Sequence, residues 1–414
     1  MDQATQDLPQ PVSFTDPKVY GCPFSAYDRL REEQPVYRDP ASGHYILTRY
    51  DDVRRALLNA SVLSNNTGVM GDRWAPEANR VFEADGWLPM NTLVSNDLPD
   101  HRVYRGLVDK VFTTQKVTSL EPRIEQIIGE LIDGFAGAAE IDFLEAFAVP
   151  LPMYVIAEQL GVAREDRARF KRWSDVAMES VNPLLSPEDQ VGVARELVDM
   201  QQYMARQIER VRATPDDALL SRLANMDTDG RRLDVRELQS LILQILVAGN
   251  ETTTTTLALG MKTLIERPEL ADEIHRDPSR AKQFVEETLR VTAPLQTLFR
   301  RALADLEIGG VSIPAGAMVE VRFGAANRDP RQFGCPADVD LDRKNSASHL
   351  TFGAGIHLCI GNQLARGELR LAFQALTRRL AGLRFSRGAD SVRWIDNYTA
   401  YGPNQLWMAF DARG

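Results

Sequence analysis

The strongest constraint on the fold is a continuous helical pattern over residues 234–266. At about 1.5 Å of rise per residue, a helix of this length spans roughly 50 Å. An apolar run at 241–247, broken only by Gln244, precedes its centre, and another at 257–259 follows it. A helix that is apolar all round is buried. We therefore expect a long interior helix, with Asp234 and Glu237 forming a capping box at its start.

The rest of the chain adds more helices and only a few strands. Apolar residues recur with helical spacing at 124–135 and again at 190–212. Strand signals are confined to residues 36–38, 45–48, 306–308, 311–313 and 318–321, with turn residues between them. Few, clustered strands do not form an array of alternating strands and helices. The predicted fold class is mainly α with small β-sheets.

Two segments lack a clear pattern. Residues 1–15 are polar and acidic, and we expect a flexible N-terminal tail there. Residues 64–97 read as a long irregular segment that carries large apolar side chains such as Trp87. Such segments are often functional, although a surface loop packed on its own side chains would have the same composition.

Charge and hydropathy exclude some classes of protein. The formal net charge is −10 at pH 7 and no Lys/Arg run is present, so no nucleic-acid partner is expected. The first residues lack the basic and apolar regions of a signal peptide. No run of about 18 apolar residues is available to span a membrane. The sequence therefore predicts a cytoplasmic protein without a membrane anchor.

The first chemical motif is a glycine-rich loop at 352–361, F-G-A-G-I-H-L-C-I-G. A lone cysteine such as Cys359 is ordinarily a small buried hydrophobe. Here glycines surround it, and they allow positive φ and a close approach of the backbone to a large or flat group. Backbone N–H groups can also stabilise a thiolate, which is a metal ligand. The loop therefore indicates a metal-binding thiolate.

The second motif lies inside the long helix, where A-G-N-E-T-T occupies residues 248–253. Threonines and a glycine weaken a helix interior, and threonine hydroxyls can bond to i−4 carbonyls and bend the axis. A solvated surface stretch would explain them, but the apolar neighbours favour a buried site. Threonines and an acid inside a buried helix suggest a local site.

These motifs resemble those of the cytochrome P-450 family. The loop matches F-G-x-G-x-H-x-C-x-G at every fixed position, followed by Leu364, Ala365, Arg366 and Glu368, and residues 248–253 match [AG]-G-x-[DE]-T-[TS]. The resemblance spans roughly Val36 to the C-terminus. It implies a single cytochrome P-450 domain over residues 16–414. In that fold, haem lies between the long central helix and the helix that follows the cysteine loop.

The resemblance also assigns roles to individual residues. It makes Cys359 the axial ligand of the iron in haem b, Glu251 a proton relay and Thr252 the group that stabilises the reacting dioxygen, for which Gly249 opens space. The cofactor-binding positions are His101, Arg105, Ala248, Gly249, Arg300, Phe352, Gly353, His357, Cys359 and Gly361. Four of them would hold the haem propionates: His101, Arg105, Arg300 and His357.

Some of these assignments have alternatives. Residues 97–105 could simply be a capped surface helix, and Arg301 could replace its neighbour Arg300. Glu287 and Arg290 form an E-x-x-R pair, which alone is usually solvated, but the resemblance joins it to Arg343 in a buried structural network.

The resemblance implies a haem-thiolate monooxygenase that inserts one oxygen atom from O2 into a small-to-medium apolar organic substrate. Electrons would come from an external ferredoxin-type donor with an NAD(P)H-dependent reductase. Arg102, Lys110 and Arg366 are candidate contacts for that donor, or solvated charges. A hydrogen-peroxide-driven peroxygenase is one alternative, although such relatives replace the acid–alcohol pair. A non-catalytic haem-thiolate sensor is another, and it would not need that pair.

Matching positions place a mostly apolar set of side chains around the substrate. The members are Trp87, Leu243, Gln244, Val247, Leu295, Gln296, Leu298 and Tyr398. We expect an apolar ligand. Either Gln244 or Gln296 could bond to a substrate oxygen, and the alternative is that both amides bond within the protein.

Overall fold

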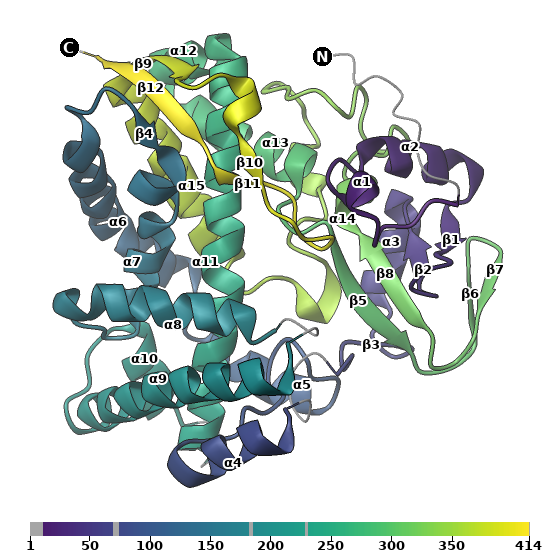
Figure 1. The fold of residues 1–414 in the computed structure, drawn as a ribbon, viewed down its shortest axis with the longest axis vertical. Helices are drawn as coiled ribbons and strands as arrows, with labels where there is room; N and C mark the ends of the chain where they lie inside the picture. Colours follow the sequence, from purple (N-terminus) through teal and green to yellow (C-terminus); the bar gives the residue numbers. More distant parts are fainter. Residues whose placement is uncertain (1–10, 69–73, 182–184, 228–230, 414) are drawn as a thin grey trace. The chain divides into compact units, whose positions relative to one another are not determined.

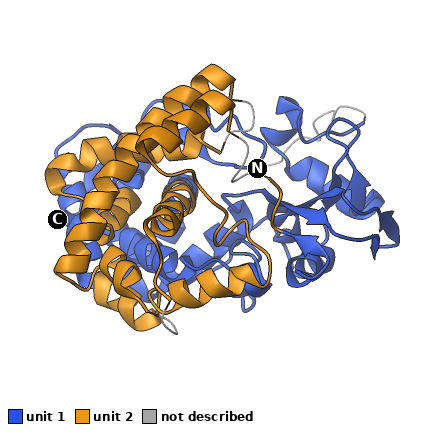
Figure 2. Ribbon diagram, turned by 90° about the horizontal axis from the view of Figure 1, so that it is seen from below, with its two compact units in different colours: residues 1–64, 121–150, 252–414 blue, residues 65–120, 151–251 orange. Residues whose placement is uncertain are grey.

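The fold comes from a computed structural model, which describes residues 11–68, 74–181, 185–227 and 231–413. The chain forms two compact units. Residues 1–64, 121–150 and 252–414 make up the first unit, and residues 65–120 and 151–251 make up the second (Figure 2). Helices α6 (Thr114–Phe135), α7 (Pro150–Gln159) and α11 (Val235–Glu266) pass from one unit into the other.

The first unit contains the main sheet, in the strand order β1-β2-β8-β5-β3 (Figure 1). These strands are β1 (Val36–Arg38), β2 (Tyr45–Leu47), β8 (Met318–Arg322), β5 (Thr297–Ala302) and β3 (Leu63–Ser64). Only β2 and β8 run parallel, and the other pairs are antiparallel. β6 (Leu306–Ile308) and β7 (Val311–Ile313) form a separate hairpin. Each strand predicted from the sequence is present, but β3 and β5 of the main sheet were not predicted.

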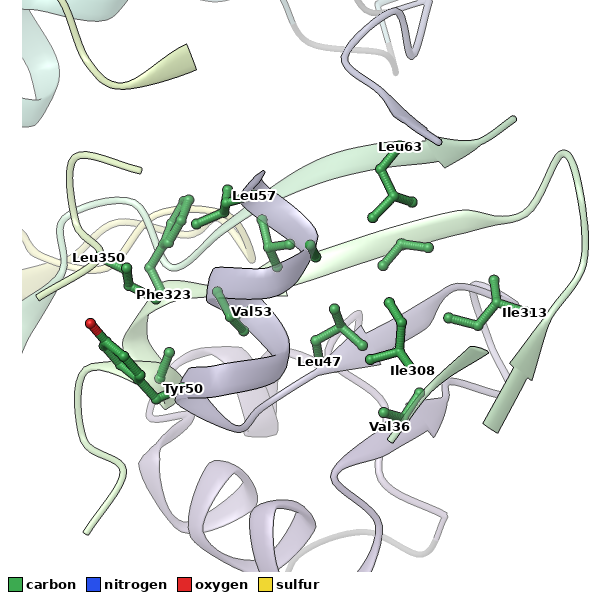
Figure 3. Close-up of a cluster of buried hydrophobic side chains, with 14 of the residues drawn as sticks. Val36, Leu47, Tyr50, Val53, Leu57, Leu63, Ile308, Ile313, Phe323 and Leu350 are labelled. Carbon is green, nitrogen blue, oxygen red and sulfur yellow. The ribbon is translucent and has the colours of Figure 1, made fainter. Parts of the chain in front are cut away.

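Helix α3 (Tyr50–Leu58) packs on this sheet through its apolar face (Figure 3). Val53 and Leu57 are one turn apart on that face, and both are buried together with Leu47 of β2 and Leu63 of β3. The i, i+4 spacing puts the two helix residues on one side. Their contact with the strands closes one core, and the opposite side of α3 stays exposed.

The remaining elements of the first unit are mostly helical. They are α1 (Pro17–Tyr20), α2 (Phe24–Glu33), α12 (Pro268–Arg276), α13 (Ala281–Thr292), α14 (Phe323–Ala326) and α15 (Asn362–Arg379), with strands β4 (Ile141–Asp142), β9 (Leu380–Phe385), β10 (Arg393–Trp394), β11 (Pro403–Gln405) and β12 (Trp407–Ala412). Phe373 of α15 packs edge-on against Phe284 of α13, with 4.9 Å between ring centroids. A Cβ at Gly260 of α11 would lie 2.3 Å from the Phe373 ring, so this glycine lets the two helices meet.

The second unit consists of helices. They are α4 (Pro76–Asp85), α5 (Asp100–Asp109), α8 (Arg167–Glu179), α9 (Pro187–Ala213) and α10 (Leu219–Asn225), with most of α7 and the first half of α11. The predicted capping box is present at the start of α11. The Asp234 carboxylate accepts from the Glu237 N–H at 2.8 Å, and the Glu237 carboxylate accepts from the Asp234 N–H at 2.9 Å. The two bonds satisfy N–H groups that the helix itself leaves unpaired.

Two predictions need correction. Residues 1–10 of the predicted tail lie outside the described residues, but Val12 and Phe14 are buried and Ser13 donates to Asp39. Residues 12–14 are therefore packed and do not belong to a flexible tail. The segment predicted to be irregular, residues 64–97, contains the ten-residue helix α4. Across the described residues, no helix combines the length and apolar character needed to cross a membrane.

Candidate functional site

The cysteine loop is shaped by its glycines. Gly353 and Gly355 have φ values of +72° and +71°, which residues with a side chain rarely adopt. A Cβ at Gly355 would also lie 2.9 Å from the Leu57 carbonyl oxygen of α3. The Cys359 N–H donates to the Phe352 carbonyl at 2.9 Å and closes the loop. The sequence pattern therefore produces a tight loop with Cys359 at its end.

Cys359 is half-buried and lies just before α15, which begins at Asn362. The Asn362 side chain donates from Nδ2 to the Cys359 carbonyl at 2.5 Å and holds the two residues together. The partial positive charge at a helix N-terminus favours a thiolate. The loop can therefore present a charged sulfur, which is a ligand for a soft metal centre such as haem iron.

Glu287, Arg290 and Arg343 are brought together in the first unit. The Glu287 carboxylate accepts from Arg290 at 2.7 Å and 2.9 Å and from Arg343 at 3.0 Å. It also accepts from the Asp340 N–H at 2.9 Å. Arg290 uses its remaining donors on the carbonyls of Asn327, Pro336 and Asp338. The cluster ties α13 to residues 327–343.

A second buried ionic cluster was not anticipated from the sequence. Glu286, the neighbour of Glu287 on α13, accepts from Arg366 of α15 at 2.7 Å and 3.1 Å. His349 lies 3.2 Å from the same carboxylate. The sequence signal for this cluster is weak. It consists of a second acid, Glu286, directly before the glutamate of the E-x-x-R pair.

Arg300 and Arg301 differ in burial. Arg300, on β5, is 4% exposed and donates from Nη1 to the Phe299 carbonyl at 2.7 Å, whereas Arg301 is exposed. Successive strand residues point to opposite faces, so only one of the two can face a buried group. The buried position makes Arg300 the better candidate for a carboxylate ligand.

In the second unit, α5 carries His101 and Arg105 one turn apart. Arg105 pairs with Asp109 at 2.8 Å. Burial lowers the pKa of His101, and the neighbouring Arg105 charge lowers it further. His101 is therefore a neutral imidazole near pH 7, which can donate one hydrogen bond to an acceptor. Both residues remain predictions as propionate contacts.

Helix α11 is buried along most of its length, but two small residues near its centre are exposed. Ala248 and Gly249 are exposed, although Leu246 and Asn250 on either side are buried. Apart from its chain neighbours and the nearby backbone of α11, no atom of the described residues lies within 4 Å of where a Gly249 Cβ would be. Next along the helix, burial raises the pKa of the Glu251 carboxyl. Exposed small residues beside an acid whose pKa is raised suit a compact, reactive ligand.

The predicted pocket residues divide between the units. In the second unit, the Gln244 carboxamide oxygen accepts from the Val94 N–H at 3.0 Å. Trp87 is held by Gln201, which accepts from its N–H at 2.9 Å and donates to its carbonyl at 2.8 Å. Leu243 is buried and Val247 half-buried on α11. Gln244 therefore fixes the segment after α4 against α11.

In the first unit, residues 294–298 lie beside residues 398–401. The Gln296 N–H donates to the Thr399 carbonyl at 2.7 Å, and Leu295 pairs with Ala400. Leu298 is 37% exposed, and Tyr398 packs near Phe299 with 6.1 Å between ring centroids.

The Gln296 side chain itself is engaged within the protein. Its Nε2 donates to the carbonyls of Thr292 and Ala293, and its Oε1 accepts from the Tyr27 hydroxyl. Gln296 thus matches the alternative in which the amide bonds within the protein.

Comparison with known proteins gives a consistent result. The cytochrome P450 family model matches residues 169–381. The 6-deoxyerythronolide B hydroxylase of Saccharopolyspora erythraea is 36% identical, over 94% of this chain and 96% of that protein. The vitamin D(3) 25-hydroxylase of Pseudonocardia autotrophica is 35% identical, over 94% of each chain. The solved structure of cytochrome P450 CYP109Q5 from Chondromyces apiculatus matches with a TM-score of 0.86 at 33% identity, over 97% of this chain and 98% of that one.

The described residues suit the cofactor of this family. A glycine loop can present a thiolate, a buried arginine can bind a carboxylate, and α11 exposes the small residues Ala248 and Gly249. The matches extend over nearly the whole chain and include its fold. The chain therefore belongs to the cytochrome P450 family, whose members bind haem b and act as monooxygenases.

Proposed function

We propose that this monooxygenase oxidises an apolar organic molecule that carries an oxygen function, with electrons from a ferredoxin-type donor. The observation that carries the proposal is the exposure of Ala248 and Gly249 on α11, three and two residues before Glu251, which Thr252 follows. Bound haem supplies the oxidising chemistry, and a cysteine thiolate ligand increases the electron density that favours O–O cleavage. The remaining tasks fall to side chains.

Proton supply is the task we assign to Glu251 and Thr252. Because burial raises the pKa of Glu251, its carboxyl holds a proton at a higher pH than an exposed glutamate does. It can take that proton from water and release it inward. Thr252 follows on the same helix and offers a hydroxyl that both donates and accepts. The pair can thus move protons without opening the site to bulk water.

The substrate class follows from Gln244 and its surroundings. Its carboxamide oxygen is used by Val94, but its buried Nε2 has no hydrogen-bond partner among the described residues. An unmet buried donor is costly, at about 1–3 kcal/mol, and favours a ligand with an acceptor. The neighbouring Leu243 and Val247 are apolar. A mainly apolar molecule with a carbonyl or hydroxyl group satisfies both features.

The named relatives are consistent with this substrate class, since one is a 6-deoxyerythronolide B hydroxylase and another a vitamin D(3) 25-hydroxylase. For this chain, the acceptor group is the part of the substrate that we assign to Gln244.

The donor surface is proposed on α3. Arg54, Arg55 and Leu58 are exposed and line a surface pocket, and Leu58 approaches to within 3.5 Å of a Cβ built on Gly355 in the cysteine loop. The same pocket also includes Asp51, so two cations face one acid there, and the remaining positive charge beside an apolar residue suits an acidic ferredoxin. A donor that draws on NAD(P)H also places the reaction in the cytoplasm.

Replacing Thr252 by alanine tests the function. With ferredoxin, reductase and NAD(P)H, we expect the variant to consume electrons but to form less product and more hydrogen peroxide. Thr263→Ala is the matched control, because Thr263 lies farther along α11 and only bonds to the Leu259 carbonyl at 2.9 Å.

Unchanged coupling in Thr252→Ala would contradict the proton relay. Full turnover with hydrogen peroxide alone would indicate a peroxygenase, and no turnover with either oxidant would indicate a sensor.

A further inference from the structure

A buried ionic cluster joins α13 to α15 close to the cysteine loop. Glu286 is 5% exposed and accepts from Arg366 through Nε at 2.7 Å and Nη2 at 3.1 Å. Such a two-point contact fixes the plane of the guanidinium as well as its position. Arg366 lies on the first two turns of α15, so the cluster anchors the start of the helix that follows Cys359.

From this anchor, Arg366 reaches the carbonyl side of Cys359. Its Nη1 donates to Asn362 Oδ1 at 3.0 Å, and Asn362 Nδ2 donates to the Cys359 carbonyl at 2.5 Å. Asn362 is the first residue of α15. The orientation of this amide, and through it the Cys359 carbonyl, therefore depends on Arg366.

Arg366 also reaches the N–H side of Cys359. Its guanidinium carbon lies 4.4 Å from the centroid of the Phe352 ring, a cation–π contact. The Phe352 carbonyl accepts the Cys359 N–H at 2.9 Å. Both backbone polar groups of Cys359 thus bond to residues that Arg366 holds.

His349 is the third member of the cluster, and its ring also packs on Phe352, with 5.7 Å between ring centroids. Its Nδ1 accepts from the Thr351 N–H at 3.2 Å, and its Nε2 lies 3.2 Å from the Glu286 carboxylate. Burial acts to raise the pKa of Glu286, but His349 and the Arg366 charge outweigh it and bring that pKa to about 2. Glu286 is therefore ionised at neutral pH and pairs there with the Arg366 guanidinium.

We propose that Glu286 and Arg366 form a positioning pair for Cys359, which fixes the direction of its sulfur and the reduction potential of the centre that it ligates. This role is distinct from that of Glu287, which bonds to residues 327–343 and not to the loop. The proposal rests on Cys359 being the haem ligand. The proposal predicts that variants of the pair shorten the lifetime of the thiolate–iron bond, even where the free energy of unfolding of the protein is unchanged.

The test compares Arg366→Lys with Arg370→Lys. Arg370 lies one turn further along α15 and pairs with Glu121 at 2.7 Å, so its variant breaks a similar ion pair away from the loop. In the reduced haem protein with carbon monoxide, Arg366→Lys should lose the red-shifted thiolate band roughly tenfold faster than the wild type. Arg370→Lys should match the wild type.

Reduction potentials give a second readout that a purely structural role would not move. Glu286→Gln removes an anion and should shift the potential upward, and Arg366→Gln removes a cation and should shift it downward. Equal band lifetimes and unchanged potentials in these variants would overturn the proposal. If Glu286→Gln fails to fold, Arg366→Lys still decides, because it keeps the charge. A wild-type protein without the thiolate band would instead refute the ligand assignment itself.

Discussion

Replacing Glu287 by glutamine removes the carboxylate that two buried guanidiniums share. Glu287 is 0% exposed and accepts four hydrogen bonds, two from Arg290, one from Arg343 and one from the Asp340 N–H. A glutamine oxygen in the Oε2 position could keep three of them. Its amide group would then face Arg290 Nε as donor against donor. The charge that balances Arg290 and Arg343 would be lost altogether.

Breaking a buried ion pair by removing one partner costs about 3–5 kcal/mol, because it leaves an uncompensated charge. We expect a loss of this size in the free energy of unfolding of Glu287→Gln, measured by urea denaturation followed by circular dichroism. Glu121→Gln is the control. Its ion pair with Arg370 is partly exposed, at 32% and 28%, and should contribute about 0–1 kcal/mol. Equal losses in the two variants would refute the reasoning.

Three further predictions concern buried acidity, ligand choice and the donor. Burial raises the pKa of Glu368 to about 8 from an unfolded value of 4.5, so native stability falls as pH rises through this window. Glu368→Gln should flatten that fall in pH-dependent unfolding, and an unchanged profile would show that the acid is not protonated. Gln244→Leu should weaken the affinity for a ketone ligand roughly tenfold, as measured by the spin-state shift of the haem, but should leave the affinity for the deoxygenated analogue unchanged. Equal losses of affinity for the two ligands would exclude the hydrogen bond. Reversing the charges of Arg54 and Arg55 should raise the KM for ferredoxin in reductase-coupled turnover, and only at low salt, because salt screens exposed charges. A KM that does not depend on these charges would exclude this surface as the donor site.

Much of the fold could be predicted because its signals are local. The long apolar pattern and the Asp234–Glu237 capping box mark α11, and turn residues mark the hairpins of β1–β2 and β6–β7. Helix α4 was missed because it has few apolar residues and packs against α9, a contact made at a distance in sequence. Local pattern alone cannot supply such a partner.

The candidate site shows the same division. The cysteine loop and the acid–alcohol pair are contiguous motifs, so the sequence displays them directly. The cluster of Glu286, His349 and Arg366 draws on residues from three separated segments, and its members have no fixed spacing. The difference between Gln244 and Gln296 is also tertiary, since it depends on which amide finds partners within the protein.

The central claim is that Cys359 binds haem iron as a thiolate. The most direct measurement is the absorption spectrum of the reduced protein with carbon monoxide, recorded for the wild type and for Cys359→His. We predict a strongly red-shifted Soret band in the wild type, typical of thiolate ligation, and its loss in the variant. A histidine-type spectrum in the wild type, or a red-shifted band that persists without Cys359, would contradict the account.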